Sequence, residues 1–141
     1  MYTIEFKLDD FAAAHRLIRN YQGKCANLHG HNYEIYAGLK NDKLNSAGFV
    51  IDFDQIKDLF NNWVMANIDH SVLIDPQDQE LTAFVETYKQ KHFVMPRDKS
   101  TTVENIAEVL FENFTRLLKN KNFLSYVTVY ENKNSKATFT A

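Results

Sequence analysis

The stretch CANLHGHNYEIYAGL, residues 25–39, decides how this chain is expected to fold. From His31 onward its side chains alternate as those of a half-buried strand do, with Tyr33 and Ile35 on one face. Because alternate residues of a strand point to the same side, His29 and His31 can direct both imidazoles at one point. The stretch therefore predicts a strand that begins with two candidate metal ligands.

A third histidine ends the strand that precedes this stretch, in FAAAH, residues 11–15. If the two strands pair as a hairpin, their ends lie side by side and His15 can join the other two. Zn²⁺ in catalytic sites takes three protein ligands and keeps a fourth position open, so His15, His29 and His31 are candidate zinc ligands. The alternative is that His29 and His31 are two half-exposed histidines that lie close together by accident. Cys25 is left with two alternatives: a fourth ligand that closes a structural site, or a base beside the metal.

The remaining elements follow from the spacing of apolar residues. Residues 2–8 alternate as a strand, and a helical stripe follows Asp54, which is expected to be its N-cap. We further expect a helical stretch at 81–91 inside an insertion of about residues 75–99, a helix at 102–118, and strands at 125–131 and 137–140. This order predicts a single α+β domain over residues 1–141, with an antiparallel four-stranded sheet (ββααββ-like) and the helices on one face.

The composition is that of an ordinary globular chain. Of its 141 residues 45% are hydrophobic and 24% are charged, and the formal net charge is −2. This charge makes no electrostatic case for nucleic acid or an anionic membrane as a partner, and no apolar run is long enough to span a bilayer. The single cysteine and the lack of a signal-peptide pattern fit a reducing compartment, so we expect the protein in the cytoplasm.

Six motifs recur in the order in which one enzyme family carries them. They are FAAAHRL (11–17), CANLHGHNY (25–33), GFVIDF (48–53), IDH (68–70), TVEN (102–105) and VYE (129–131). Together they resemble the 6-pyruvoyltetrahydropterin synthase and 6-carboxytetrahydropterin synthase family, over most of the chain but not over the insertion. The resemblance implies the tunnelling fold, in which subunits join their sheets into a barrel, commonly as a homo-oligomeric dimer of trimers with active sites between subunits.

The resemblance also implies roles for individual residues. The three histidines would hold zinc, and Cys25 would be the catalytic base rather than a ligand. Asp69 and His70 would complete a Cys–Asp–His relay, although consecutive residues of a strand point apart and an ordinary helix-to-strand junction is the alternative. The implied substrate is a small pterin, 7,8-dihydroneopterin triphosphate, whose side-chain hydroxyls zinc would acidify as a Lewis acid. Glu131 would anchor the pterin by accepting two N–H bonds at its amino-pyrimidinone edge.

Further candidates for substrate contact lie at the start of the third predicted helix and near the histidines. Thr101 and Glu104 match a capping box before an apolar helix, and capping by itself explains Glu104. Pterin contact by Glu104, Thr102 or the adjacent backbone would be a secondary role. Three basic residues could meet the triphosphate or remain solvated surface charges: Arg16, Arg19 and Lys24.

The spacing of Cys25 and His29 bears on the product. Three residues separate them, which resembles the bacterial 6-carboxytetrahydropterin synthases of the queuosine pathway. The biopterin-making relatives usually have a longer gap, and folate-pathway variants replace this cysteine with glutamate. The resemblance thus implies a lyase that forms 6-carboxytetrahydropterin, acetaldehyde and triphosphate. The alternatives are 6-pyruvoyltetrahydropterin synthesis by triphosphate elimination and, from another class, a non-catalytic protein in which Cys25 closes a structural zinc site.

Overall fold

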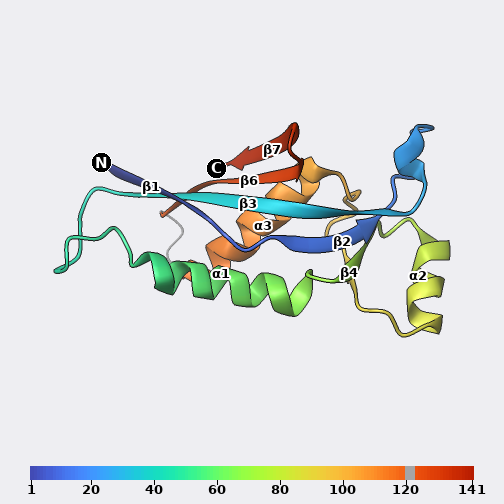
Figure 1. The fold of residues 1–141 in the computed structure, drawn as a ribbon, viewed down its shortest axis with the longest axis horizontal. Coiled ribbons are helices and arrows are strands. Elements are labelled where there is room, and N and C mark those ends of the chain that lie inside the picture. Colours follow the sequence, from blue (N-terminus) through green and yellow to red (C-terminus); the bar gives the residue numbers. More distant parts are fainter. Residues whose placement is uncertain (120–122) are drawn as a thin grey trace.

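A computed structural model describes residues 1–119 and 123–141 of the chain (Figure 1). Its elements in chain order are β1 (Tyr2–Lys7), β2 (Phe11–His15), the 3₁₀ helix η1 (Lys24–Ala26), β3 (His29–Asn41), α1 (Phe53–Asn67), β4 (Ser71–Ile74), α2 (Gln79–Thr87), β5 (His92–Val94), α3 (Val103–Leu118), β6 (Leu124–Asn132) and β7 (Ser135–Thr140). Figure 1 shows an elongated molecule with β3 running along most of its length. None of the helices in these ranges is long and apolar enough to cross a membrane.

β3 is the central strand of the sheet. The strand order is β5-β4-β2-β3-β6-β7, and β1 pairs with residues 36–41 of β3, beyond the part that pairs with β2. β6 lies along the other side of β3 and pairs with its residues 34–39. The thirteen residues of β3 therefore contact three strands, and the end that carries His29 and His31 lies next to β2.

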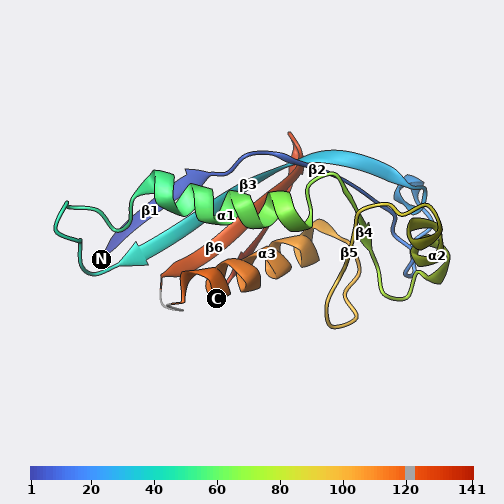
Figure 2. The same ribbon diagram turned by 90° about the horizontal axis from the view of Figure 1, so that it is seen from below.

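The predicted four-stranded antiparallel sheet is wrong. The sheet has seven strands, and β4 pairs in parallel with both β2 and β5. The N-terminal strand is interrupted between Lys7 and Phe11, so two separate strands pair with β3 where the sequence suggested one. β4 and β5 contain only four and three residues, which is too short to show a period. The α+β class is correct, because helices and sheet occupy separate layers (Figure 2).

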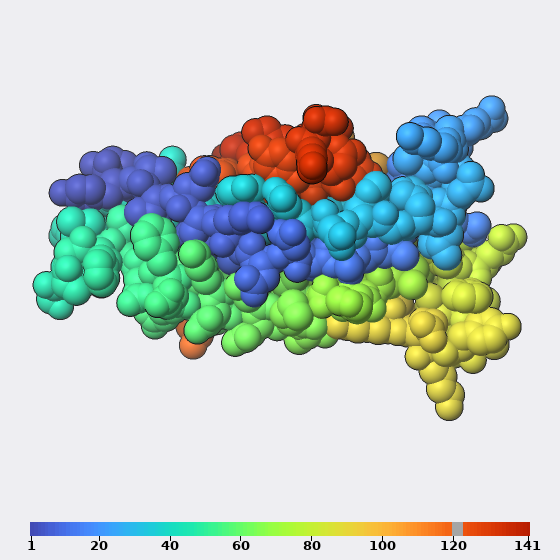
Figure 3. All heavy atoms as spheres, viewed as in Figure 1, coloured from blue at the N-terminus to red at the C-terminus, as the bar shows by residue number. Residues whose placement is uncertain are grey.

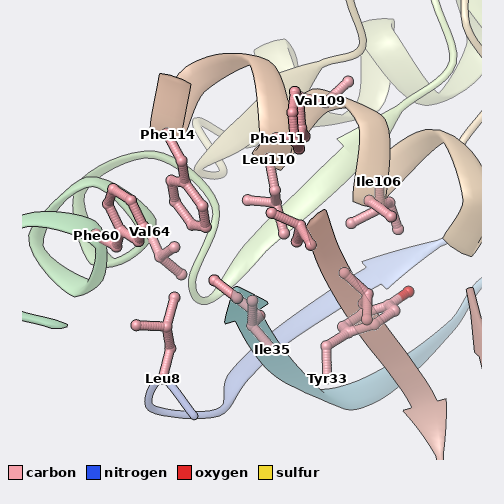
Figure 4. Packing of buried hydrophobic residues seen from close by; sticks show 14 of the residues in the cluster. Leu8, Tyr33, Ile35, Phe60, Val64, Ile106, Val109, Leu110, Phe111 and Phe114 are labelled. Carbon is pink, nitrogen blue, oxygen red and sulfur yellow. The ribbon is translucent and has the colours of Figure 1, made fainter. Parts of the chain in front are cut away.

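The helices α1 and α3 lie on the same face of the sheet, as predicted (Figure 2). Their apolar side chains and those of β3 enclose the core shown in Figure 4, where Phe60 and Val64 come from α1 and Phe114 from α3. The rings of Phe60 and Phe114 stack with their centroids 4.1 Å apart. Since β3 adds the fully buried Tyr33 and Ile35 to this core, the same packing holds the strand that begins with the histidines.

Two helix boundaries differ from the prediction. The N-cap of α1 is Asp52 rather than Asp54, because the backbone is still extended at Asp52 and its carboxylate accepts hydrogen bonds from the next turn. α2 spans Gln79–Thr87 rather than 81–91, because Lys89 has a positive φ of 53° that ends the helical path. α2 and the connection from β2 to β3 lie at the same end of the molecule (Figures 1 and 3).

Candidate metal centre

Three histidines lie side by side where β2 and β3 pair. In the antiparallel register His15 is opposite His29 and Ala13 is opposite His31, so the three side chains share one face of the sheet. The ring centroids are 4.7 Å apart for His15 and His29, 5.3 Å for His15 and His31, and 4.8 Å for His29 and His31. The pairing of the two strands thus gathers the three residues that the sequence pattern selected.

Backbone carbonyl groups orient two of the three rings. The Nδ1 atom of His15 lies 2.8 Å from the carbonyl oxygen of Thr101, and Nδ1 of His29 lies 2.7 Å from that of Asn27. Since a carbonyl oxygen only accepts, Nδ1 carries the proton in both rings and the lone pair is on Nε2, the arrangement typical of metal-bound histidine. Nε2 of His29 and Nε2 of His31 are buried and have no hydrogen-bond partner among the described residues. These atoms are what a metal ion would satisfy.

Glu131 of β6 completes the group, which we call the histidine cluster: His15, His29, His31 and Glu131. Its Oε1 atom lies 3.1 Å from Nε2 of His31 and 4.0 Å from Nε2 of His15. The four ligand atoms all lie within 4.8 Å of one another, and nitrogen and carboxylate donors suit zinc and other divalent transition metals. The cluster could therefore hold a metal ion.

The position of Glu131 beside the histidines was missed by sequence reasoning, which considered it only as a pterin anchor. The pairing of β3 with β6 places Tyr130 beside Glu34, so these two side chains share one face of the sheet. The next residue, Glu131, lies on the other face, as Tyr33 and His31 of β3 do. Alternation along β6 could have given the face of Glu131. Its distance from the histidines depends on a register between strands about a hundred residues apart, for which the sequence has no signal.

Burial favours the neutral imidazole at two positions of the cluster, His15 and His31. It lowers the pKa of His15 to about 4, against the hydrogen bond to Thr101, and the neighbouring imidazoles act in the same direction as burial. Burial also lowers the pKa of His31, although the charge of Glu131 acts to raise it. Because a metal binds only the neutral ring, His15 remains available as a ligand at neutral and mildly acidic pH, and burial favours the same form of His31.

The metal-free protein is expected to lose stability as the pH falls from 6.5 to about 4. The folded pKa of His15 is about 4 against an ordinary 6.5, so in this interval the unfolded chain binds the proton more readily. Above this interval the contribution of His15 to the free energy of unfolding is constant. Across the interval that free energy falls by on the order of 3 kcal/mol. Urea unfolding at several pH values checks this, and His15→Gln should show a shallower pH dependence. An equal pH dependence of stability in the wild type and in His15→Gln would contradict the lowered pKa of His15.

Cys25 lies on η1, in the connection of residues 16–28 between β2 and β3, which we call the Cys25 loop. The residue is half-buried, and its carbonyl oxygen accepts a hydrogen bond of 2.9 Å from the N–H of Leu17. A hydrogen bond with the Cys25 side chain is the main cause that raises the pKa of Tyr21. Among the described residues, Cys25 is not one of those whose ligand atoms form the cluster. The loop that carries the thiol nevertheless starts and ends at two cluster histidines.

Asp69 and His70 form a pair at the start of β4. His70 has a positive φ of 57°, and its Nδ1 atom lies 2.7 Å from Oδ2 of Asp69. An extended backbone would point the two side chains apart, but the positive φ at this helix-to-strand junction allows them to meet. Asp69 also accepts a hydrogen bond of 3.0 Å from the N–H of Ala12. Burial acts to raise the pKa of Asp69, but the hydrogen bonds from Ala12 and His70 outweigh it and lower the pKa.

This pair is separate from the histidine cluster of the same chain. The N–H of His70 donates to the carbonyl oxygen of Ala12, which precedes His15 by three residues, or roughly 10 Å, along β2. The His70 side chain is 80% exposed and lines an open pocket of about 450 Å³ together with Ala12, Gly30 and His31 of the cluster. The described residues show no hydrogen bond or ion pair between His70 and Cys25. Within one chain, the described residues thus show the Asp69–His70 pair of the predicted relay without a contact to Cys25.

The start of α3 supports His15 and does not form the predicted capping box. The N-cap is Thr102, whose hydroxyl accepts from the N–H of Asn105 at 3.4 Å. Thr101 is fully buried, and its carbonyl oxygen accepts the Nδ1 proton of His15. Glu104 is exposed in the first turn, where a negative charge is favourable. Sequence reasoning missed the support from Thr101 because a backbone carbonyl is not encoded by residue type.

Comparison with known proteins agrees with this fold. The family model described as 6-pyruvoyl tetrahydropterin synthase matches residues 3–141. The 6-carboxy-5,6,7,8-tetrahydropterin synthase of Rickettsia conorii is 38% identical over 128 residues, which cover 89% of this chain and 91% of the relative.

Two solved structures have a similar fold. That of Caenorhabditis elegans 6-pyruvoyl tetrahydropterin synthase has a TM-score of 0.74 at 26% identity and covers 99% of this chain and 95% of its own. An uncharacterized protein of Wolinella succinogenes has a TM-score of 0.81 at 20% identity, over 99% of this chain and 97% of its own, and bears on the fold alone. With the family model matched over nearly the whole chain, and a relative this similar over most of its length, the chain belongs to the 6-pyruvoyl tetrahydropterin synthase family.

Proposed function

We propose that this protein is a zinc-dependent lyase that converts 7,8-dihydroneopterin triphosphate into 6-carboxy-5,6,7,8-tetrahydropterin, acetaldehyde and triphosphate, as a step of queuosine biosynthesis in the cytoplasm. The observation that carries the proposal is the histidine cluster with its buried, unpartnered Nε2 atoms, next to a loop that bears a cysteine. The family match supports a pterin substrate. The name of the Rickettsia conorii relative supports the carboxylated product.

The three histidines are the proposed zinc ligands. Hydrogen bonds to backbone carbonyl groups hold the rings of His15 and His29 with the lone pair on Nε2, which supports this role. When bound, zinc supplies Lewis-acid activation of the hydroxyl groups on the substrate side chain. Cys25 is the proposed base that removes a proton from a carbon of that side chain. Its position outside the cluster supports a base rather than a fourth ligand.

Glu131 is the proposed anchor of the pterin ring. Its side chain is 24% exposed, so a bound molecule can reach it, and a carboxylate can accept two parallel N–H bonds from the amino-pyrimidinone edge. A pterin edge bound to Glu131 would lie next to the imidazole of His31. Thr102 and Glu104 remain proposed secondary contacts. They follow Thr101, which contacts His15, so the first turn of α3 starts near the cluster.

We further propose that Asp69 and His70 act in the active site of a neighbouring subunit, within a homo-oligomer of the dimer-of-trimers type. Their hydrogen bond is already formed, and the His70 side chain is 80% exposed, beside Ala12 rather than at the His15 end of β2. An imidazole there could return a proton to the pterin after Cys25 has removed one. β7 and β5 are the edges of the sheet in a single chain, and joining sheets into a barrel would cover such edges.

Mixed oligomers test the shared site. Cys25→Ala and His70→Ala should each be nearly inactive, whereas oligomers that contain both variants should recover about one quarter of wild-type turnover, since random mixing pairs an intact cysteine with an intact neighbouring histidine at that frequency. Co-expression with two different affinity tags and sequential purification isolates the mixed species. No recovery in these species would show that Cys25 and His70 act within one subunit or that His70 has no role.

The product identifies the reaction. Zinc-loaded protein incubated with 7,8-dihydroneopterin triphosphate should yield 6-carboxytetrahydropterin, detected by mass spectrometry together with acetaldehyde and triphosphate. Accumulation of 6-pyruvoyltetrahydropterin alone would replace the proposal with the activity named for the Caenorhabditis elegans protein. No turnover of the zinc-loaded protein would favour a non-catalytic metal protein.

A further inference from the structure

The first residues of the Cys25 loop are joined to the segment in front of α2 by two bidentate ion pairs. Arg16 donates from Nε and Nη2 to both carboxylate oxygens of Asp78, each at 2.6 Å. Arg19 binds both oxygens of Asp75 in the same way, at 2.7 and 2.6 Å. Asp75 and Asp78 are 2% and 3% exposed, so both anions are buried. Neither arginine is therefore a solvated surface charge.

The same pairs reach the segment that orients His15. Arg19 also pairs with Asp98 at 3.1 Å. Arg97 and Asp98 have positive φ angles of 50° and 56°, a conformation that residues other than glycine hold only where the surroundings support it. The chain continues from there to Thr101, whose carbonyl oxygen accepts the Nδ1 proton of His15. Arg19 thus contacts the strained turn that leads to this support.

Backbone hydrogen bonds connect the two arginines to the cysteine and to Thr101. Leu17 follows Arg16, and its N–H donates to the carbonyl oxygen of Cys25 at 2.9 Å. The hydroxyl of Thr101 donates to the carbonyl oxygen of Arg16 at 3.3 Å. Residues 16–19 therefore contact both the turn that carries Cys25 and the segment that holds His15.

We propose that the pairs Arg16–Asp78 and Arg19–Asp75 form a positioning clamp that sets the distance between Cys25 and the histidine cluster. This inference rests on the proposed function, in which the cysteine is the base. The four residues touch neither metal nor substrate in this role and act through the loop. A base displaced by about 1 Å from its proton can lower turnover about 100-fold, so the clamp should affect catalysis more than binding.

The test starts from Asp78→Asn, because asparagine keeps the shape and the N-cap of α2 but removes the charge. We expect kcat to fall about 10- to 100-fold while KM changes less than about threefold and zinc content stays constant. Arg16→Gln should behave alike, although it also loses the 3.5 Å contact with the exposed Glu80. The double variant should be no worse than Arg16→Gln, because both lose the Arg16–Asp78 pair. Asp10→Asn, which makes the same change in the exposed pair of Asp10 with Lys7 at 3.2 Å, is the matched control and should leave kcat unchanged.

The competing explanation is that the arginines bind the triphosphate directly. In that case Arg16→Gln would raise KM, and Asp78→Asn would leave turnover intact because it frees the arginine for the substrate. That pair of results would overturn the clamp. Should Asp78→Asn fail to fold, the double variant leaves no unpaired buried charge and allows the same measurements.

A second readout does not depend on the proposed reaction. Cys25 is the only cysteine of the chain, so its alkylation by iodoacetamide can be followed by mass spectrometry in the zinc-loaded protein. Loosening the loop should accelerate alkylation at least about fivefold in Asp78→Asn and not in Asp10→Asn. A rate within about twofold of wild type in Asp78→Asn would refute the clamp. If the wild-type protein shows no turnover, the proposed function fails, and alkylation still decides whether the clamp positions the cysteine.

Discussion

Replacement of Cys25 by alanine is expected to lower turnover of the zinc-loaded protein about 1,000-fold, within the range that loss of a general base produces. Zinc content and the melting temperature should stay at their wild-type values. The physical reason is that the thiol is not among the four gathered ligand atoms and is only half-buried. Turnover, zinc content by atomic emission and thermal unfolding should be measured on the same preparation.

Cys25→Ser separates shape from acid–base chemistry in this experiment. Serine nearly conserves the volume of the side chain, but a hydroxyl does not ionise near neutral pH, so the serine variant should be as inactive as the alanine variant. Loss of zinc and of thermal stability together in both variants would point instead to a closed structural site with Cys25 as the fourth ligand. The same measurement thus distinguishes an enzyme from a non-catalytic metal protein.

Replacement of His29 by alanine should remove the metal. Its Nε2 atom is buried without a partner among the described residues, and its Nδ1 atom is held by the carbonyl oxygen of Asn27, so the ring is oriented before any ion binds. We expect zinc affinity to fall by more than about 100-fold, beyond the effect of losing an outer-shell residue, and turnover to fall to background. His92→Ala is the matched control, because His92 is exposed on β5 and lies outside the cluster.

Removal of the metal by a chelator tests the same site without a substitution. A chelator should lower both turnover and melting temperature of the wild-type protein, and added zinc should restore them, because an ion that binds only the folded chain stabilises it. The melting temperature of His29→Ala should not respond to the chelator. A His29→Ala protein that retains stoichiometric zinc and turnover would show that this histidine is not a ligand.

The parts of the fold that the sequence predicted are those with a period of their own. The apolar stripe of 103–118 identified α3, and alternation after His31 identified β3. The elements that the sequence did not predict are short, or they form only by pairing with distant strands. β4 and β5 are too brief to show a pattern, and their parallel pairing needs neighbours that are far apart in sequence.

By itself, the sequence determined that His29 and His31 share one face of a strand, because the alternation of side chains is a local property of extended backbone. It also selected His15, since a hairpin places strand ends together. Only the tertiary structure decided that Glu131 lies 3.1 Å from His31, because that distance depends on the register of β6 against β3. Only the tertiary structure decided the pairing of Asp69 with His70, which a positive φ permits.

The same distinction applies to the arginines that follow His15. Their charge is evident in the sequence, but the carboxylates that hold them are 56 and 62 residues away, beyond β3, α1 and β4. A contact at that separation is set by how β4 packs beside β2, which no local preference of either segment encodes. Local alternation therefore determined which residues face the metal centre, whereas long-range strand register and buried ion pairs determined what surrounds it.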